Sequence, residues 1–238
     1  MKRHEPSSRP AGQPSVQDYT DLAPSYDVER YVSEEHAAHE ERRRRVLSSL
    51  LPRGVTLAAD IACGTGRGLP VLRTVADTVV GVDGTLAMLS KAREKVGDRT
   101  PLTQANAVAL PFKDGAFDLI TCLNFLHLFP RSDEKTAFVT EMGRVLKPGG
   151  VLIAEFDNAL QGVVLGPVRK YFGPDIGYDW PSTIHKAFRK DIFVATEVSG
   201  ANLPFVWRVP FLRILNDYTT SFPLNYLATR IFVRAVRR

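Results

Sequence analysis

The chain has 238 residues, of which 44% are hydrophobic and 24% are charged, and it carries a formal net charge of +5. This composition is typical of a globular protein and excludes collagen-like and wholly disordered chains. Cys63 and Cys122 form no CxxC motif or Cys/His cluster, so we expect no metal site and a reducing compartment. Without a secretory signal or an apolar run long enough to span a bilayer, the sequence predicts a cytoplasmic protein with no membrane span.

The N-terminal part divides into a tail and a helical segment. Residues 1–17 are rich in Pro, Ser and Arg and predict a disordered tail, which leaves 18–238 as one domain. The spacing of apolar residues predicts a helix over 27–51. Its arginine run, 42–45, either contacts a phosphate or forms a solvated helix face, and we favour the solvated face. Other basic residues gather at the two chain ends, so we expect no nucleic-acid partner.

Strands and helices alternate after this segment. Apolar and β-branched runs predict strands over 57–62, 78–83, 102–107, 117–123, 151–156 and 231–236, with helices over 69–75, 85–96 and 133–146 between them. This alternation predicts an α/β fold with a mostly parallel sheet and helices on both faces. Residues 158–210 are irregular, and we expect a variable cover over the carboxyl edge of the sheet rather than a second domain.

The most informative segment is the turn Asp60-Ile61-Ala62-Cys63-Gly64-Thr65-Gly66-Arg67-Gly68. A strand ends there in a carboxylate, and glycines let the chain turn tightly and let a ligand lie against the backbone. A dinucleotide motif needs Gly or Ala where the chain has Leu69, and a Gly-Lys-Ser/Thr ending for a phosphate loop is absent. The turn therefore fits neither of these two motifs, and a plain tight turn between a strand and a helix is the alternative to a ligand site.

Three segments together carry a resemblance to a known family. The spacing of Asp60, Ala62, Gly64 and Gly66 resembles the E/D-x-G-x-G-x-G motif of class I S-adenosylmethionine (SAM)-dependent methyltransferases, with Ala62 in place of the first glycine. Residues 106–120 and 144–152 resemble two further segments of that family, most closely its ubiquinone/menaquinone-biosynthesis type. The resemblance implies a Rossmann-like, seven-stranded sheet whose last strand is antiparallel and inserted beside its neighbour.

The resemblance also implies which residues hold SAM, or its product S-adenosylhomocysteine (SAH). Asp83 would accept the ribose hydroxyls, although an Asp at this place also suits a turn or a helix cap. Asn106 stands where the family has an acidic residue that binds the amino group of the adenine. The amide oxygen of Asn106 can still accept that hydrogen bond. Tyr19 and Tyr26 resemble tyrosines that cover the cofactor. The expected cofactor-binding set is Tyr26, Asp60, Ala62, Cys63, Gly64, Gly66, Asp83, Gly84, Met88, Asn106, Ala107 and Asn124.

His127 follows the predicted strand 117–123 and is the best candidate for a general base, because a histidine titrates near neutral pH. The alternative is a histidine that only packs locally, and His185 is a weaker candidate. Aromatic residues of the predicted cover either line an acceptor pocket or form the core of that cover. These residues are Tyr171, Phe172, Tyr178, Trp180, Phe188 and Trp207.

The sequence thus predicts transfer of a methyl group from SAM to an oxygen, nitrogen or carbon atom of a small molecule, with secondary-metabolite or quinone biosynthesis as a fitting setting. Methylation of RNA or protein is the second hypothesis, although no Asn/Asp-Pro-Pro-Phe/Tyr motif for a flipped base is present. A SAM-binding regulatory protein without catalysis is the third. A nicotinamide-dependent oxidoreductase is the fourth, and Leu69 argues against it.

Overall fold

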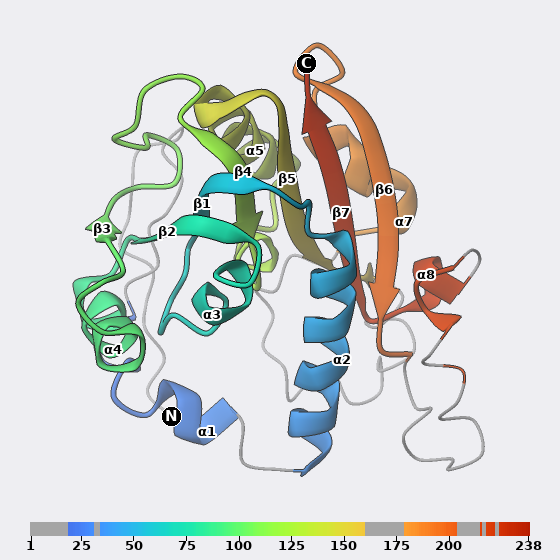
Figure 1. Cartoon of the computed structure of the whole chain (residues 1–238). Helices are drawn as coiled ribbons and strands as arrows, with labels where there is room; N and C mark the ends of the chain where they lie inside the picture. Colours follow the sequence, from blue (N-terminus) through green and yellow to red (C-terminus); the bar gives the residue numbers. More distant parts are fainter. Residues whose placement is uncertain (1–18, 31–33, 160–178, 204–214, 216–217, 222–223) are drawn as a thin grey trace.

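A seven-stranded sheet forms the centre of the computed structural model, which describes residues 19–30, 34–159, 179–203, 215, 218–221 and 224–238 (Figure 1). The strands are β1 (Val55–Ile61), β2 (Ala76–Asp83), β3 (Leu102–Gln104), β4 (Phe117–Cys122), β5 (Leu146–Asp157), β6 (Phe193–Ala201) and β7 (Arg230–Arg237). They follow the order β3-β2-β1-β4-β5-β7-β6, and β7 runs antiparallel to both of its neighbours. The predicted α/β class and the inserted antiparallel strand are confirmed.

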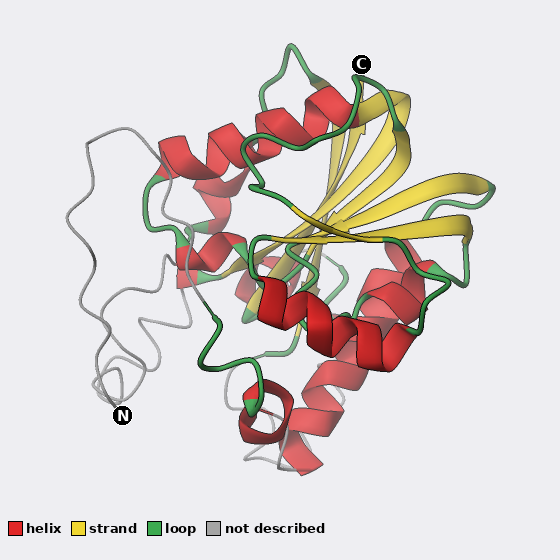
Figure 2. Cartoon of the chain, turned by 90° about the vertical axis from the view of Figure 1, so that its left-hand side faces the viewer, coloured by secondary structure: helices red, strands yellow, loops and turns green. Residues whose placement is uncertain are grey.

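Helices cover both faces of this sheet (Figure 2). The longer ones are α2 (Glu34–Leu50), α4 (Leu86–Val96) and α5 (Ser132–Val145), and the short ones are α1 (Tyr26–Arg30), α3 (Leu69–Leu72), α7 (Pro181–Ile184), α8 (Leu224–Leu227), η1 (Leu126–Leu128) and η3 (His185–Ala187). Apolar side chains of α2, α3 and α4 share one core with the sheet, while those of α5 and η3 share the core on the opposite face. This arrangement leaves the carboxyl ends of the parallel strands open for a site.

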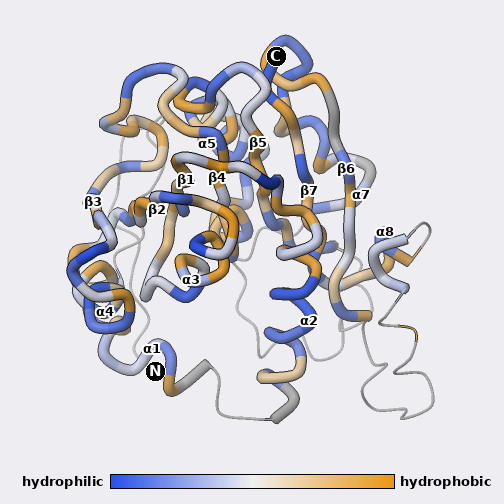
Figure 3. The backbone as a smooth tube through the Cα atoms, in the orientation of Figure 1, coloured by the Kyte–Doolittle hydropathy of each residue, from blue (hydrophilic) through white to orange (hydrophobic). Residues whose placement is uncertain are grey.

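The central strands are apolar on both sides because helices bury both faces of the sheet. Ala58, Ala59 and Ile61 of β1 and Leu119 and Ile120 of β4 are each 0% exposed. In Figure 3 the hydrophobic colours gather on the sheet, whereas much of α2 is hydrophilic. None of the helices in the described part of the chain combines the length and the apolar character that a membrane crossing requires.

Several element boundaries differ from the prediction. The predicted helix over 69–75 is limited to the four residues of α3, and the strand predicted over 102–107 ends at Gln104. β5 begins at Leu146 rather than at 151, because α5 passes directly into a strand that pairs first with Phe117 and then, after a register shift, with Leu119. β6 lies within residues 158–210, where the sequence predicts an irregular cover and no strand.

The arginine run of α2 is solvated only in part. Arg44 and Arg45 are exposed and pair with Glu41, as expected for a surface face. Arg43, by contrast, is largely buried and pairs with Glu155 of β5. A run of identical residues on a helix points in several directions, since successive side chains are about 100° apart.

Much of the predicted tail and cover lies outside the described residues, including Tyr171, Phe172, Tyr178 and Trp207. Phe188 is buried and packs against Phe156 and Phe193, with ring centroids 6.0 Å and 5.6 Å away. It therefore belongs to the core. Trp180 is 50% exposed, and His185 lies exposed in η3.

Candidate functional site: two hollows at the carboxyl edge of the sheet

The turn after β1 has the backbone geometry that its glycines suggested. Gly64 and Gly66 adopt φ of 53° and 80°, and Ala62 adopts φ of 59°, although it carries a Cβ. The left-handed region costs an alanine about 1 kcal/mol. At Gly66 a Cβ would lie 3.0 Å from Cβ of Ala92, so glycine also lets α4 approach the turn.

Asp83, the last residue of β2, holds this turn in place. Its two carboxylate oxygens accept hydrogen bonds from the backbone N–H groups of Gly64, at 2.8 Å, and Thr85, at 2.9 Å. Burial raises the pKa of the Asp83 carboxyl, and these backbone donors oppose that rise. Each oxygen of the carboxylate keeps capacity for a further donor, such as a hydroxyl group.

Asp60 is buried next to the turn. Its side chain is 3% exposed, and its Oδ1 accepts a hydrogen bond from the Thr121 hydroxyl at 2.7 Å. Burial, together with the nearby charge of Asp83, raises the pKa of Asp60 to about 7. A Cβ on Gly68 would stand 2.6 Å from Oδ2 of Asp60, so only glycine fits there.

Two hollows flank the turn, and we call them the apolar hollow and the charged hollow. The apolar hollow is lined by Tyr19, Tyr26, Ile61, Ala62, Gly64, Val82, Asp83, Gly84, Thr85, Met88, Ala105, Asn106, Ala107, Asn124, Phe125, Leu128, Phe129 and Phe138. The charged hollow is lined by Tyr26, Asp27, Ala37, Glu40, Glu41, Arg43, Arg44, Leu47, Asp60, Ala62, Cys63, Gly64, Thr65, Arg67, Gly68, Val71, Lys95, Leu123, Asn124 and Phe232. Four residues, Tyr26, Ala62, Gly64 and Asn124, line both and so mark the junction.

The structure brings most of the residues expected to bind the cofactor to these hollows. Nine of the twelve line the apolar hollow, and Asp60 and Cys63 line the charged one. Gly66 lines neither and acts through the shape of the turn. His127 is 8% exposed and is not among the lining residues, although Phe125 and Leu128 beside it are.

The sequence analysis missed an aromatic wall of the apolar hollow. Phe125, Phe129 and Phe138 pack together with ring centroids 4.5–5.1 Å apart. Two of these rings stand in the run Asn124-Phe125-Leu126-His127-Leu128-Phe129, where they could have been recognised from the sequence. Such a wall favours a ring or another apolar group in the hollow.

Asn124, at the junction, rests on a buried charge cluster that the sequence analysis also missed. Its backbone N–H donates to Oε2 of Glu155 at 2.9 Å, and its φ is 55°. Glu155 is 1% exposed, and the charges of Arg43, Arg230 and His127 lower its pKa to about 2 against the effect of burial. Arg230 also donates to Oδ1 of Asn124 at 3.3 Å. A residue held in a sparsely populated conformation by such contacts is typical of functional sites.

Comparison with known proteins agrees with this site. Residues 59–154 match a family model described as a methyltransferase domain. A demethylmenaquinone methyltransferase of Lactiplantibacillus plantarum is 31% identical over 160 residues, which cover 63% of this chain and 65% of that relative, just under two thirds of its length.

Solved structures share the fold at lower identity. A SAM-dependent methyltransferase of Thermotoga maritima, described as a possible histamine N-methyltransferase, superposes with a TM-score of 0.66 at 18% identity over 92% of this chain and 98% of that one. The magnesium protoporphyrin IX methyltransferase of Synechocystis with bound SAH gives 0.62 at 17% identity, with coverages of 92% and 98%.

The sheet order, the glycine turn and the matched domain agree with the resemblance of the chain to class I SAM-dependent methyltransferases. Their cofactor is SAM. Within that class the chain is similar to demethylmenaquinone methyltransferases, which act in quinone biosynthesis. The space at Gly64 fits the cofactor, because a Cβ built there meets nothing within 4 Å and the residue faces both hollows.

Proposed function

We propose that the protein transfers the methyl group of SAM to an oxygen, nitrogen or carbon atom of a small-molecule acceptor. The observation that carries this proposal is the junction of the two hollows at Gly64. A left-handed glycine, an alanine in the same conformation and the Asp83 carboxylate meet there, at the carboxyl ends of β1 and β2. Ligands of open α/β sheets bind at this edge.

In this proposal the nucleoside of the cofactor occupies the part of the apolar hollow beside Asp83 and Met88, and the acceptor enters beside the aromatic wall. Asp83 and Gly84 take the ribose, since the carboxylate can accept both hydroxyl groups. Met88, Asn106 and Ala107 surround the adenine. Asn106 already uses its Oδ1 to accept from the N–H of Val108 at 3.1 Å, which leaves its NH₂ group to donate to a ring nitrogen.

The amino-acid part of the cofactor then lies at the junction and in the charged hollow. Ala62, Cys63 and Gly64 line the charged hollow with Asp60 behind them, and Gly66 shapes the turn. Tyr26 and Asn124 line both hollows and would flank the path between cofactor and acceptor.

SAM supplies an activated methyl group on its sulfonium, so the protein has mainly to align the acceptor and exclude water. Phe125, Leu128 and Phe129 provide an apolar wall that suits both tasks. A base is needed only where the acceptor must lose a proton. His127 remains our candidate for that role, and a change of side-chain orientation would be needed for it to line the hollow.

For the acceptor we propose a ring-bearing small molecule of the quinone type. The aromatic wall supports a flat apolar group, and the relative from Lactiplantibacillus plantarum is named a demethylmenaquinone methyltransferase. We keep a cytoplasmic location and the absence of a nucleic-acid partner as parts of this proposal.

Transfer of radiolabelled methyl groups from SAM tests the proposal. The wild-type protein is offered quinols, phenols and amines in parallel with bulk tRNA and an unfolded protein. We expect label in at least one small acceptor, and most in a quinol. Label in tRNA or protein alone would overturn the small-molecule assignment, and SAM binding without transfer to any acceptor would favour the non-catalytic regulatory protein.

A further inference from the structure

The segment before α2 forms part of the wall of the apolar hollow. Tyr19 and Tyr26 both line the hollow and contact each other edge to face, with ring centroids 6.1 Å apart. A turn closed by hydrogen bonds from the N–H groups of Leu22 and Ala23 to the carbonyl of Tyr19 connects them. Ala23 is the buried anchor of this turn, at 3% exposure. The two tyrosines therefore lie on a short segment outside the sheet.

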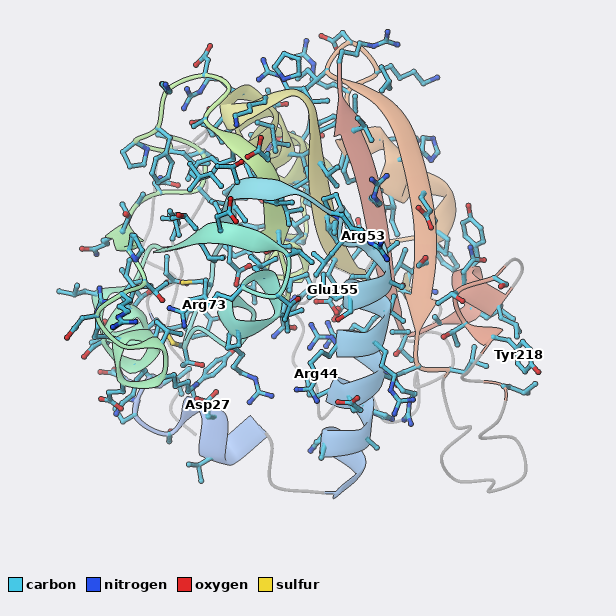
Figure 4. The ribbon with its side chains drawn as sticks, in the orientation of Figure 1. Asp27, Arg44, Arg53, Arg73, Glu155 and Tyr218 are labelled. Atoms are coloured by element: carbon cyan, nitrogen blue, oxygen red, sulfur yellow. The ribbon has the colours of Figure 1, made fainter. Side chains whose placement is uncertain are left out.

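Asp27, next to Tyr26, joins this segment to the rest of the domain (Figure 4). Its Oδ1 accepts a hydrogen bond at 3.0 Å from the hydroxyl of Thr65, which lies between Gly64 and Gly66. Its Oδ2 pairs with Nζ of Lys95, in the last turn of α4. Lys95 in turn donates to Thr65 Oγ1 at 2.8 Å, which closes a triangle of three residues.

Arg67 adds a second cation to this triangle. Its NH1 lies 3.8 Å from Oδ1 of Asp27, and its NH2 lies 3.6 Å from Oε2 of Glu40 in α2. One carboxylate thus receives contacts from Thr65 and Arg67 of the glycine-rich turn and from Lys95 of α4.

The side chains of this cluster are partly exposed, with 29% for Asp27, 38% for Lys95 and 39% for Arg67. Ion pairs of this exposure contribute up to about 1 kcal/mol each and are screened by salt. Such contacts are strong enough to bias the position of a short segment and weak enough to break while a ligand enters or leaves.

We propose that Asp27 is a positioning residue for cofactor binding: through Thr65 and Lys95 it holds Tyr19 and Tyr26 against the cofactor, and its release opens the hollow for exchange. The inference rests on the proposed function, because it takes the ligand of the apolar hollow to be SAM or SAH. Asp27 acts through the tyrosines and the turn, and it contacts neither the methyl group nor the acceptor. The same contacts couple closure of the segment to the shape of the glycine turn.

Dissociation of radiolabelled SAH into excess unlabelled SAH tests this role. Compared with the wild type, D27N keeps the size of the side chain but loses the ion pair, and we expect release to be roughly three- to tenfold faster at low salt. The expected difference shrinks at high salt, because the wild-type contact is itself screened. K95M should show a similar change, and the D27N/K95M double variant should add little to either single change.

D133N is the matched control, since Asp133 forms an exposed ion pair with Arg131 far along the chain and should leave the release rate unchanged. Amide hydrogen exchange of residues 19–30 in the SAH complex provides a second readout and should be faster in D27N, but not in α5. If D27N releases SAH and exchanges its amide hydrogens at the wild-type rates, Asp27 does not have the proposed role, and the proposed function stays intact. Failure of the wild-type protein to bind SAH would instead overturn the proposed function, and this inference with it.

Discussion

Arg43 and Glu155 form a buried ion pair that fastens helix α2 to the end of β5. Nε of Arg43 donates to Oε1 of Glu155 at 2.7 Å, and NH2 of the same guanidinium reaches Oε2. Because Oε2 also accepts the N–H of Asn124, the pair connects α2 to the junction of the two hollows. Helix α2 is therefore part of the site and not an appendage to it.

Replacing Arg43 with Met should destabilise the fold. The change leaves the Glu155 carboxylate buried beside a weaker set of cations, and removing one partner of a buried pair costs about 3 kcal/mol or more. Denaturant unfolding measures the loss. R45M is the control on the same helix. Because Arg45 is 70% exposed, its replacement should change the free energy of unfolding by less than about 0.5 kcal/mol. Equal stability of the two variants would show that the pair is not holding α2.

Replacing Asp83 with Ala should weaken the affinity for SAH tenfold or more. The variant loses the proposed ribose acceptor and also the two backbone hydrogen bonds that shape the turn. Calorimetric titration measures the affinity. D77A provides the control, since Asp77 is an exposed residue near the other end of the same strand. If D83A binds SAH as tightly as D77A does, Asp83 has no role toward the ribose.

The buried carboxyl of Asp60 should make stability fall as pH rises toward neutrality. Its pKa is about 7 in the folded protein and has an ordinary value of 3.8, so between these values the folded state keeps a proton that the unfolded chain has released. The favourable contribution is complete below pH 3.8 and is lost as pH rises through 7. Each pKa unit of separation corresponds to about 1.4 kcal/mol.

D60N isolates this effect, because an amide oxygen still accepts the Thr121 hydroxyl but the side chain no longer titrates. The wild type should lose stability between pH 5 and pH 8, and D60N should not. The free energy of unfolding of D60N minus that of the wild type, measured with denaturant, should therefore be larger at pH 8 than at pH 5. An identical difference between the two proteins at both pH values would mean that Asp60 is ionised throughout.

Replacing His127 with Ala separates its two proposed roles. If His127 is the base, turnover should fall by about a hundredfold while the affinity for SAH stays close to that of the wild type. The side chain is buried, so stability should fall as well, and unfolding measurements are needed beside the kinetics. Unchanged turnover in a folded variant would leave His127 as a packing residue that helps to balance the charge of Glu155.

The sequence predicted those parts of the molecule whose signals are local. Strand β1, the glycine turn and the apolar strands beside them follow from residue spacing, and the inserted strand β7 followed from the family resemblance. The course of β6 could not be predicted, because its packing depends on distant residues: Gly200 is needed there since a Cβ would lie 2.5 Å from Cβ of Ala228.

The charge cluster could not be predicted for a related reason. Arg43 and Glu155 are 112 residues apart, and nothing in the run 42–45 distinguishes Arg43 from the exposed Arg44 and Arg45. The same holds for Asp27 and Lys95, which meet only because α1 lies against the end of α4. Two rings of the aromatic wall, Phe125 and Phe129, in contrast stand close together in the sequence after β4, so this part of the wall could have been predicted.

A crystal structure with bound SAH tests the central claim most directly. We predict the ribose hydroxyls within hydrogen-bonding distance of Asp83, the adenine in the apolar hollow beside Met88, and the amino-acid part across Gly64. A nucleoside bound elsewhere on the protein, or SAH absent from the crystals while NADH occupies the turn, would contradict the account.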